Sequence, residues 1–285
     1  MAFKKLLIDE AKNRDLEMEG YAVLPFLTNK EVEELSGFFY AHHTQLPDGM
    51  YATSHSNDLS VRKSMNDKIQ NLCKRAINQH FINAKALGAT FMAKSKGENG
   101  SIHPHQDWNI VDENLFNSYN VWLPLVDTNM QNGTLMILPK SHLQCKNIRG
   151  LNIPSSYEKV NSEVWDYMVP INLKAGEALV YDHRLLHASG LNYNEVPRLV
   201  IVYGLIPEMA DMRYYFGRND VIEEYECTPD YYFNENILLE PTTLKQISTA
   251  KNRNPSIGLD DLKIYYLKKT SLWDRVFSLF SKKAK

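Results

Sequence analysis

The sequence predicts a mainly β fold, a β-sandwich or jelly roll with flanking helices. Short runs of β-type composition follow one another between residues 88 and 207, and no helical pattern separates them. A parallel sheet would need crossover helices between its strands, so this pattern favours antiparallel sheets packed face to face. We expect a single domain over residues 1–285, with its β core near 88–207, helices on both flanks and a C-terminal extension over 208–285.

Turn residues bound the predicted strands. The strands are expected at residues 21–25, 89–93, 119–126, 134–138, 177–181 and 198–205. Asn132-Gly133 is typical of a type I′ turn, which predicts a tight hairpin turn immediately before the strand at 134–138.

Two helices are predicted before the β core. Thr28 and Glu31 have the spacing of a capping box, and apolar residues recur at helical spacing after them, which predicts a helix over 29–42. A second apolar stripe predicts a helix over 66–82. The β core is therefore expected to have a helical N-terminal flank.

Composition excludes several classes of protein. The formal net charge of −2 argues against broad nucleic-acid binding, which usually requires a basic excess. The three cysteines lie far apart, which is typical of thiols in a reducing compartment. Neither a signal peptide nor an apolar run of membrane-spanning length is evident, so we expect a cytoplasmic protein without an integral membrane span.

The most informative motif is His105-Gln106-Asp107, followed by His187 and then by Arg198. Two imidazoles and one carboxylate form the facial triad that holds non-heme Fe(II) and leaves coordination positions open. Residues two apart on a strand point to the same face, so His105 and Asp107 can both face a metal while Gln106 points away. His103 is a competing ligand, but the carboxylate requirement favours His105 and Asp107. His183, four residues before His187, would suit a helical ligand pair, and the β-type context argues against that.

Several motifs around these residues resemble the phytanoyl-CoA dioxygenase family. The resemblance covers roughly residues 16–207, with the motifs in the same order. They are Glu19–Pro25, Ile102–Trp108, Val121–Asp127, Asn132–Leu135, Leu138–His142, Gly176–Val180, His187–Gly190 and Pro197-Arg198. One departure is Lys140, where the family often has glycine, and this puts the conformation of a turn in doubt. Beyond residue 207 no family motif is found.

The resemblance implies a double-stranded β-helix (jelly-roll, cupin-like) enzyme that uses Fe(II), 2-oxoglutarate and O2. Carried over by position, His105, Asp107 and His187 would be the iron ligands. Arg198 would bind the distal carboxylate of 2-oxoglutarate, and Ser189 would add a hydroxyl to it. Related halogenases lack the carboxylate ligand, so Asp107 favours hydroxylation.

We therefore expect a dioxygenase that hydroxylates an unactivated C–H bond of a small organic molecule, with release of succinate and CO2. An amino-acid-like compound, an acyl group and a natural-product intermediate all remain open as substrates. One alternative is a non-catalytic jelly-roll binding or regulatory protein. Another is a cupin-type metal oxygenase that needs no 2-oxoglutarate.

Some further residues have weaker functional interpretations. Trp108, Trp122, Gln106 and Asn120 are candidates to line the pocket, although strand tryptophans are more often core residues. The aromatic segment over 212–233 is expected either to cover the substrate or, with more support, to pack on the barrel as a structural layer. Residues 271–285 have the pattern of an amphipathic helix with a basic end, which suits docking on the domain or a second subunit, or weak membrane contact.

Overall fold

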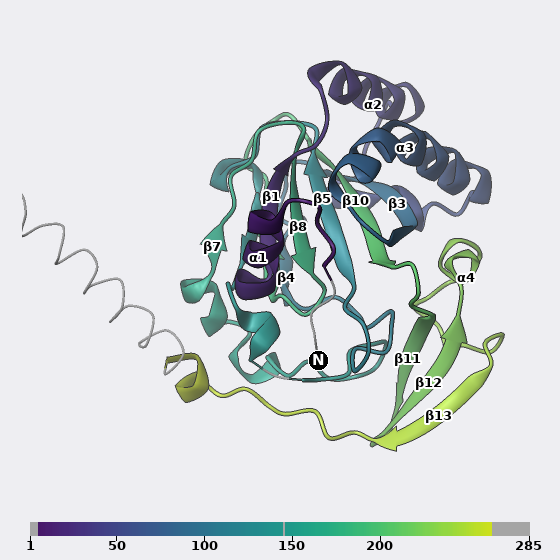
Figure 1. The fold of residues 1–285 in the computed structure, drawn as a ribbon. Coiled ribbons are helices and arrows are strands. Elements are labelled where there is room, and N and C mark those ends of the chain that lie inside the picture. Colours follow the sequence, from purple (N-terminus) through teal and green to yellow (C-terminus); the bar gives the residue numbers. More distant parts are fainter. Residues whose placement is uncertain (1–4, 145, 264–285) are drawn as a thin grey trace, which may run out of the picture.

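A computed structural model describes residues 5–144 and 146–263 (Figure 1). The chain begins with α1 (Glu10–Glu19), β1 (Tyr21–Pro25), α2 (Asn29–His42), β2 (Met50–Ala52) and α3 (Leu59–His80). Short 3-10 helices occur at Thr53–His55, Met130–Asn132, Ser141–Leu143, Glu158–Val160 and Glu163–Tyr167. The predicted strand at 21–25 is confirmed at both of its ends.

Two antiparallel sheets form the β core. The larger sheet has the order β1-β8-β5-β10-β3-β2 and includes β3 (Ala84–Lys94), β5 (Tyr119–Pro124), β8 (Glu177–Asp182) and β10 (Arg198–Pro207). The smaller sheet has the order β4-β9-β6-β7, with β4 (Ile102–His105), β6 (Leu135–Ile137), β7 (Val169–Pro170) and β9 (His187–Ser189). This arrangement confirms the predicted jelly roll.

Alternate residues of the large sheet pack into two different hydrophobic cores, one on each face of the sheet. Val121 and Leu123 of β5 pack with the helices of the N-terminal flank, whereas Trp122 packs with Leu179 and Val200 on the opposite face of the sheet. Because side chains alternate between faces, the strands are buried on both sides and are apolar along most of their length. Even-numbered residues of β10, including Arg198, therefore share the inner face with Trp122.

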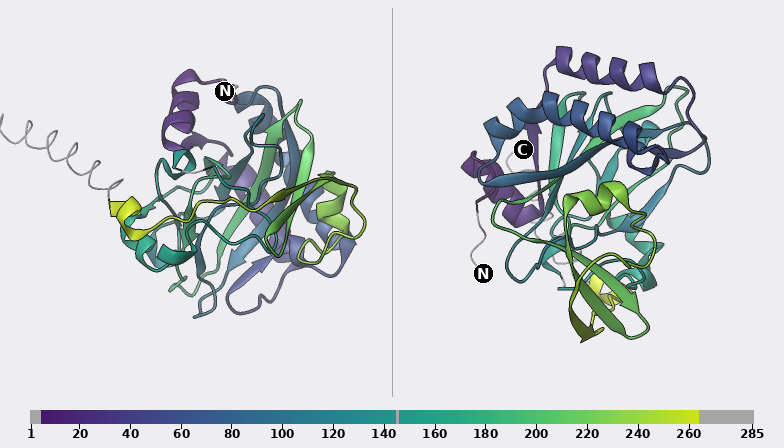
Figure 2. Two further views of the ribbon diagram at one scale, coloured as in Figure 1. Left: turned by 90° about the horizontal axis from the view of Figure 1, so that it is seen from below. Right: turned by 90° about the vertical axis from the view of Figure 1, so that its right-hand side faces the viewer.

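The N-terminal helices cover the outer face of the large sheet, and Figure 2 shows α2 and α3 lying side by side on it. The capping box is confirmed, with Thr28 and Glu31 bonded reciprocally at the start of α2. Helix α3 begins seven residues earlier than predicted, because Asp58 caps it and the apolar stripe starts only after its first turn. Helix α1 was not predicted, since its polar sequence buries little more than Leu16 and Asn13.

The prediction of a type I′ turn at Asn132-Gly133 was wrong. Asn132 ends a 3-10 helix and caps it through its side chain, and only Gly133 has a positive φ, of 69°. A type I′ turn needs positive φ at both central residues. Strand β6 consequently pairs with β9 and β7 in the second sheet and forms no hairpin with β5.

The described part of the C-terminal extension contains more strand than the predicted helical flank implies. It forms a three-stranded antiparallel sheet of β11 (Met212–Arg218), β12 (Val221–Cys227) and β13 (Gln246–Lys251), with the short helix α4 (Pro229–Asn234) between β12 and β13 (Figure 1). The expected tail helix over 271–285 lies outside the described residues. None of the helices in residues 5–144 and 146–263 combines the length and apolar character that a membrane crossing needs.

Candidate functional site

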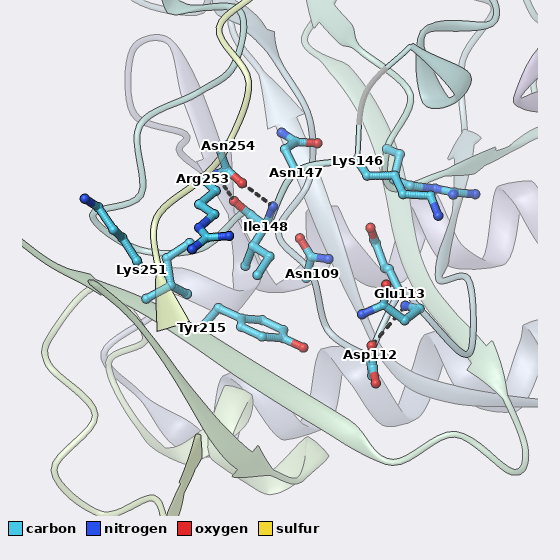
Figure 3. Close-up of a pocket in the computed structure, with 13 residues that line it drawn as sticks. Asn109, Asp112, Glu113, Lys146, Asn147, Ile148, Tyr215, Lys251, Arg253 and Asn254 are labelled. Atoms are coloured by element: carbon cyan, nitrogen blue, oxygen red, sulfur yellow. Dashed lines mark hydrogen bonds between the residues drawn. The ribbon is translucent and has the colours of Figure 1, made fainter. Parts of the chain in front are cut away.

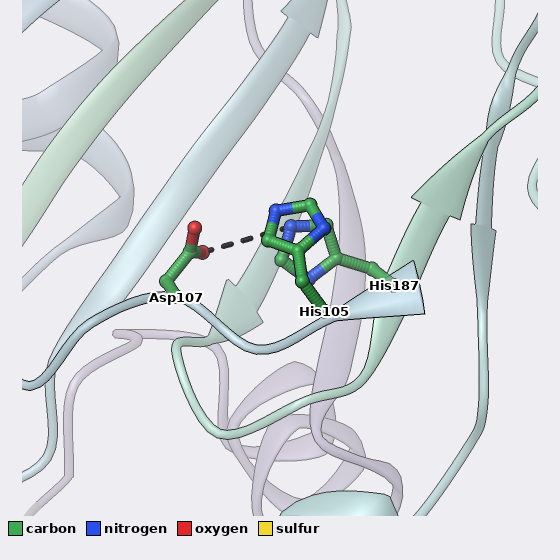
Figure 4. A group of neighbouring side chains, drawn as sticks. All are labelled: His105, Asp107 and His187. Atoms are coloured by element: carbon green, nitrogen blue, oxygen red, sulfur yellow. Dashed lines mark ion pairs between the residues drawn. The ribbon is translucent and has the colours of Figure 1, made fainter. Parts of the chain in front are cut away.

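The smaller sheet brings together the three residues that the sequence predicts as metal ligands. His105 ends β4 and His187 begins β9, and the two residues pair directly across these antiparallel strands. Asp107 follows β4 by two residues. One potential ligand atom from each of the three side chains lies within 4.8 Å of the others, and Figure 4 shows both rings beside the carboxylate. The group has the composition of a facial metal triad.

Backbone carbonyls orient both imidazole rings. Nδ1 of His105 lies 2.8 Å from the carbonyl oxygen of His103, and Nδ1 of His187 lies 2.9 Å from that of Leu185. A carbonyl oxygen can only accept, so each Nδ1 must carry the proton. Nε2 of each ring therefore keeps its lone pair, which a metal ion requires.

The surroundings of Asp107 and His187 favour the protonation states that bind a metal. Burial lowers the pKa of His187 to about 4, so its imidazole is neutral near pH 7. Burial raises the pKa of Asp107, but the imidazoles of His187, His183 and His105 outweigh it and the net shift is downward. Asn120 also stabilises the carboxylate, because its Nδ2 donates to Oδ2 of Asp107 at 2.9 Å.

The competing histidines do not join this group, although the backbone N–H of Asp107 donates to the carbonyl oxygen of His183 at 3.0 Å. His103 is exposed and joins no metal-ligating group among the described residues, so the structure brings His105 and not His103 to the triad. Nδ1 of His183 lies 2.9 Å from the hydroxyl of Ser118. Gln106 points its amide toward Asn147 and the carbonyl of Arg184, away from the triad, as the strand alternation predicts.

Arg198 begins β10 on the inner face of the large sheet and is 1% exposed. Its Nη1 donates to the hydroxyl of Ser189 at 2.9 Å and to the carbonyl oxygen of Gly133, and its guanidinium lies 5.5 Å from the Trp122 ring. Nε has no hydrogen-bond partner in the described chain, and no carboxylate there pairs with this cation. Burial lowers the pKa of Arg198 to about 9. An anion would satisfy both the charge and the free donor.

A buried lysine beside Arg198, Lys94, was missed by the sequence analysis. Its Nζ donates to the hydroxyl of Ser189 at 2.6 Å, to the carbonyl oxygen of Ser189 at 3.2 Å and to that of Gly190. Burial, and then repulsion by Arg198, lowers the pKa of Lys94 to about 6. The available signal was a lysine at an inward position of the β3 strand, directly after the apolar run that ends at Ala93.

A cavity of about 250 Å³ adjoins the triad through Asn120, which lines the cavity and also donates to Asp107. Residues of β3, β10 and the C-terminal extension form most of its walls. Among the aromatic residues of segment 212–233, Tyr232 and Phe233 line this cavity, whereas Tyr214, Phe216, Tyr225 and Tyr231 form an aromatic cluster against which Tyr232 also packs. The segment therefore forms a packed layer, as the favoured prediction has it, and that it covers a substrate stays a prediction. Trp108 packs edge-on against Tyr214 in that cluster.

A second hollow is polar and lies between the loop around Asn147 and β13 (Figure 3). Its lining includes acids, bases and amides, and the amide of Asn254 is bonded to both backbone groups of Ile148. Arg149 and Glu113 form a buried ion pair beside it. Charges of both signs line this hollow, among them Glu113, which pairs with Arg149, and Arg184, which pairs with Asp182.

The model of the phytanoyl-CoA dioxygenase (PhyH) family matches residues 17–200. The chain belongs to this family. A relative from Danio rerio, "Phytanoyl-CoA dioxygenase domain-containing protein 1", is 27% identical over 156 residues, which cover 52% of this chain and 53% of that protein. "Phytanoyl-CoA dioxygenase" from Arabidopsis thaliana is 31% identical over 116 residues, covering 39% of this chain and 41% of that protein. The chain therefore matches about half the length of these family members or less.

Solved structures show the same fold at low identity. The epimerase SnoN, crystallised with Fe3+, alpha ketoglutarate and nogalamycin RO, superposes with a TM-score of 0.55 at 17% identity, covering 86% of this chain and 97% of SnoN. The alpha-ketoglutarate-dependent carbocyclase SnoK superposes with a TM-score of 0.53 at 13% identity, covering 73% of this chain and 86% of SnoK. The family fold thus supports both an epimerase and a carbocyclase.

The departure from the family pattern at Lys140 has a structural counterpart. Lys140 has φ +66° and ψ 1°, the left-handed conformation in which glycine is least strained. Its Nζ contacts Glu19 at 2.9 Å, and its backbone N–H donates to the carbonyl oxygen of Glu19. The turn that the family often builds with glycine is therefore kept here with a lysine.

Proposed function

We propose that this protein is a dioxygenase that uses Fe(II), 2-oxoglutarate and O2 to oxidise a small organic molecule. The observation that supports this most strongly is the pairing of a metal-type triad with a buried arginine that has no acidic partner among the described residues. Burying an unpaired arginine is energetically costly. A metal-binding protein that does not use 2-oxoglutarate would have no need for such an arginine.

In this proposal His105, Asp107 and His187 hold the iron, and Arg198 binds the distal carboxylate of 2-oxoglutarate. When bound, iron and 2-oxoglutarate supply with O2 an oxidant for a C–H bond, and succinate and CO2 are released. Ser189 orients Arg198 by accepting a hydrogen bond from its guanidinium. The Ser189 hydroxyl itself donates to the carbonyl oxygen of Gly133 at 2.8 Å, and it can rotate to donate to the carboxylate of 2-oxoglutarate instead. Asn120 holds Asp107 in its ligating position.

Hydroxylation is the outcome we propose for the substrate. Asp107 occupies the carboxylate position of the triad, so three protein side chains are available to the metal and the site differs from one in which a halide replaces the carboxylate. The epimerase and carbocyclase activities in the names of SnoN and SnoK mark other outcomes that this fold supports. Product analysis by mass spectrometry separates these outcomes, because hydroxylation adds one oxygen and epimerisation leaves the mass unchanged.

The ligand assignment is tested by absorption spectroscopy under anaerobic conditions. Protein with Fe(II) and 2-oxoglutarate is expected to develop a metal-to-ligand charge-transfer band, and His105→Ala and Asp107→Ala should each abolish it. His103→Ala is the matched control, since His103 is a nearby but exposed histidine. An undiminished band in His105→Ala, or loss of the band in His103→Ala, would refute the assignment.

Succinate formation tests the alternatives. A non-catalytic jelly-roll protein would bind the metal but form no succinate from 2-oxoglutarate, even in slow uncoupled turnover. A cupin-type oxygenase without a 2-oxo acid would retain iron but fail to bind 2-oxoglutarate. The buried cation at Arg198 argues against both alternatives.

A further inference from the structure

The cavity beside the triad has a floor built from three neighbouring strands. Gly204 of β10 pairs with Gly88 of β3 on one side and with Asn120 of β5 on the other. Both glycines line the cavity, and the register of β10 and β3 shifts directly after them. Because Gly88 and Gly204 have no side chains, they leave space above the sheet. Asn120, which donates to Asp107, lies at one end of this space.

The C-terminal extension forms the roof of this cavity. Met212 from β11, Tyr232 and Phe233 from α4 and Ile237 after it all line the space. Phe233 lies so close to Gly88 that a Cβ added to the glycine would fall 2.7 Å from its ring. Arg62 of α3 fixes this roof by donating to the carbonyl oxygen of Phe233 at 2.9 Å. Floor and roof are thus held by different parts of the chain.

The walls are uncharged. The lining is mainly aliphatic and aromatic, and among the described residues that form it there is no aspartate, glutamate, lysine or arginine. The polar side chains of the lining belong to Ser54, Thr90, Asn120, His183 and Tyr232. A charged group placed here would lose part of its hydration without gaining a counter-charge from the lining, which is unfavourable.

Two of these lining side chains have a buried polar atom without a hydrogen-bond partner in the described chain. They are Nε2 of His183 and the hydroxyl of Tyr232. The other ring nitrogen of His183 is already engaged by the hydroxyl of Ser118, which can donate or accept, so Nε2 can serve as an acceptor or as a donor. Buried polar groups in native proteins are almost always paired, so an occupant with a polar oxygen would complete this wall.

We propose that the cavity is the substrate site and that it takes a small, uncharged, mainly apolar alcohol whose hydroxyl is bound by His183 and Tyr232. The inference rests on the proposed function and narrows its substrate class. A free amino acid would place two charges in an uncharged space of about 250 Å³, at the small end of ligand cavities. A neutral alcohol satisfies both the apolar walls and the two unpartnered atoms.

A set of probes with one carbon skeleton tests the charge selection. Cyclohexylmethanol, methylcyclohexane, cyclohexanecarboxylate and cyclohexylmethylamine are compared for binding to the full chain by ligand-observed NMR, with Fe(II) and 2-oxoglutarate present under anaerobic conditions. The alcohol should bind at least tenfold more tightly than the acid or the amine, and several-fold more tightly than the hydrocarbon. Equal binding of the alcohol and the hydrocarbon would mean that the hydroxyl forms no hydrogen bond with His183 or Tyr232, which would overturn the proposal. Preference for the acid or the amine would also overturn it.

A carrier-bound substrate is distinguished by a further arm of the same experiment. The coenzyme A thioester of cyclohexanecarboxylic acid presents the same ring on a large charged carrier. If the cavity takes free neutral molecules, the thioester should bind no more tightly than the acid. Tighter binding of the thioester than of the alcohol would overturn the inference in favour of an acyl carrier.

Single substitutions connect the binding to this cavity. Tyr232→Phe removes one hydroxyl and should weaken alcohol binding by roughly 3- to 10-fold while leaving methylcyclohexane unaffected. Tyr231→Phe is the matched control, because Tyr231 is the neighbouring tyrosine of α4 and belongs to the aromatic cluster, not to the residues that line the cavity. Equal effects of the two variants would contradict the assignment of Tyr232.

Filling the floor provides a test that does not depend on a polar group. A Cβ at Gly204 would meet its nearest neighbour at 3.6 Å, an ordinary contact, so Gly204→Ala should fold and occupy cavity space. It should weaken alcohol binding several-fold and leave 2-oxoglutarate binding unchanged. Undiminished alcohol binding in this variant would overturn the location. Alcohol binding without succinate formation under any condition would instead overturn the proposed function and leave the cavity assignment standing.

Discussion

Lys94 and Arg198 lie directly opposite each other on β3 and β10, and both donate to the hydroxyl of Ser189. Each side chain is almost completely buried, and neither has a carboxylate partner among the described residues. Burial, and then repulsion by the Arg198 cation, lowers the pKa of Lys94 to about 6, so its amine gains a proton more readily when an anion lies beside it. We therefore expect one carboxylate of the dianionic co-substrate to lie between or beside Lys94 and Arg198.

The first prediction concerns the binding of 2-oxoglutarate. Arg198→Met should weaken it by at least 100-fold, and Lys94→Met by roughly 10-fold, because each removes a charged donor from a buried carboxylate site. Saturating 2-oxoglutarate raises the free energy of unfolding of the wild type, by about 2.7 kcal/mol at a concentration of 100 Kd. Thermal unfolding of the metal-loaded protein, with and without 2-oxoglutarate under anaerobic conditions, measures the effect.

The control for this prediction is Lys96→Met. Lys96 is two residues further along the chain, is largely exposed and pairs with Glu195. Its replacement should leave the shift in melting temperature caused by 2-oxoglutarate unchanged. A full shift in Arg198→Met would mean that the co-substrate carboxylate is bound elsewhere.

The second prediction concerns the metal. Asn120→Ala removes the amide that donates to Asp107, so the carboxylate loses its orientation and a stabilising hydrogen bond. We expect metal affinity to fall by about 10- to 100-fold, as for other partners of metal ligands. Competitive titration with a chelator measures the change. Asn114→Ala, at an exposed position, should have no effect, and an equal loss in both variants would argue against the role of Asn120.

The proximity of His105 and Asp107 was predictable because two residues separated by one position in extended chain point to the same side, although β4 ends at His105 and Asp107 lies beyond it. Arg198 was correctly placed at the start of a strand. The pairing of His105 with His187 depends on which strands become neighbours, a long-range property that the family resemblance supplied. The start of the helix at 29–42 was predictable because its capping box, Thr28 and Glu31, lies within four residues.

The errors have physical causes as well. Asn132-Gly133 has the composition of a hairpin turn, but the Asn132 side chain bonds backbone at Asn129 and Asp127 and stabilises a 3-10 turn instead. Lys94 was overlooked because lysine is rarely buried, and only the tertiary fold places Ser189 and Gly190 around its amine. The cavity depends on the register of Gly88 against Gly204, which pairs residues far apart in the chain.

The third prediction concerns stability at low pH. Glu31 accepts two hydrogen bonds from Arg75 and two from Thr28, and the bond with Arg75 is the largest cause that lowers the pKa of Glu31 to about 2. A carboxylate whose folded pKa lies below its unfolded pKa stabilises the fold fully above the unfolded value, near 4.5, and loses this contribution as the pH falls toward 2.

Glu31→Gln should therefore lower the free energy of unfolding at pH 7 by about 1 kcal/mol, a value reduced for the partial exposure of the Arg75 side chain. The difference from the wild type should narrow between pH 4.5 and pH 2. Urea unfolding at several pH values measures it. Glu33→Gln, on an exposed face of the same helix, should show no such pH dependence. A constant difference at all pH values would contradict the ionic contribution.

The last prediction separates the roof of the cavity from the metal site. Gly150 packs against β11 so closely that an added Cβ would lie 2.1 Å from the carbonyl oxygen of Tyr215. The same loop holds β11 through the bond from the Gly217 N–H to the carbonyl oxygen of Leu151, at 2.8 Å. Gly150→Ala must therefore displace β11, the strand that begins with the cavity residue Met212.

We expect Gly150→Ala to lower the free energy of unfolding by about 1–3 kcal/mol. Alcohol binding should weaken because the roof moves, whereas the 2-oxoglutarate-dependent shift in melting temperature should persist because Arg198 lies on a different sheet. Gly37→Ala is the control, since a Cβ there meets nothing within 4 Å, and alanine in α2 should stabilise the protein by about 0.5–1 kcal/mol. If Gly150→Ala reduced both binding events equally, the C-terminal extension would be coupled to the co-substrate site as well as to the cavity.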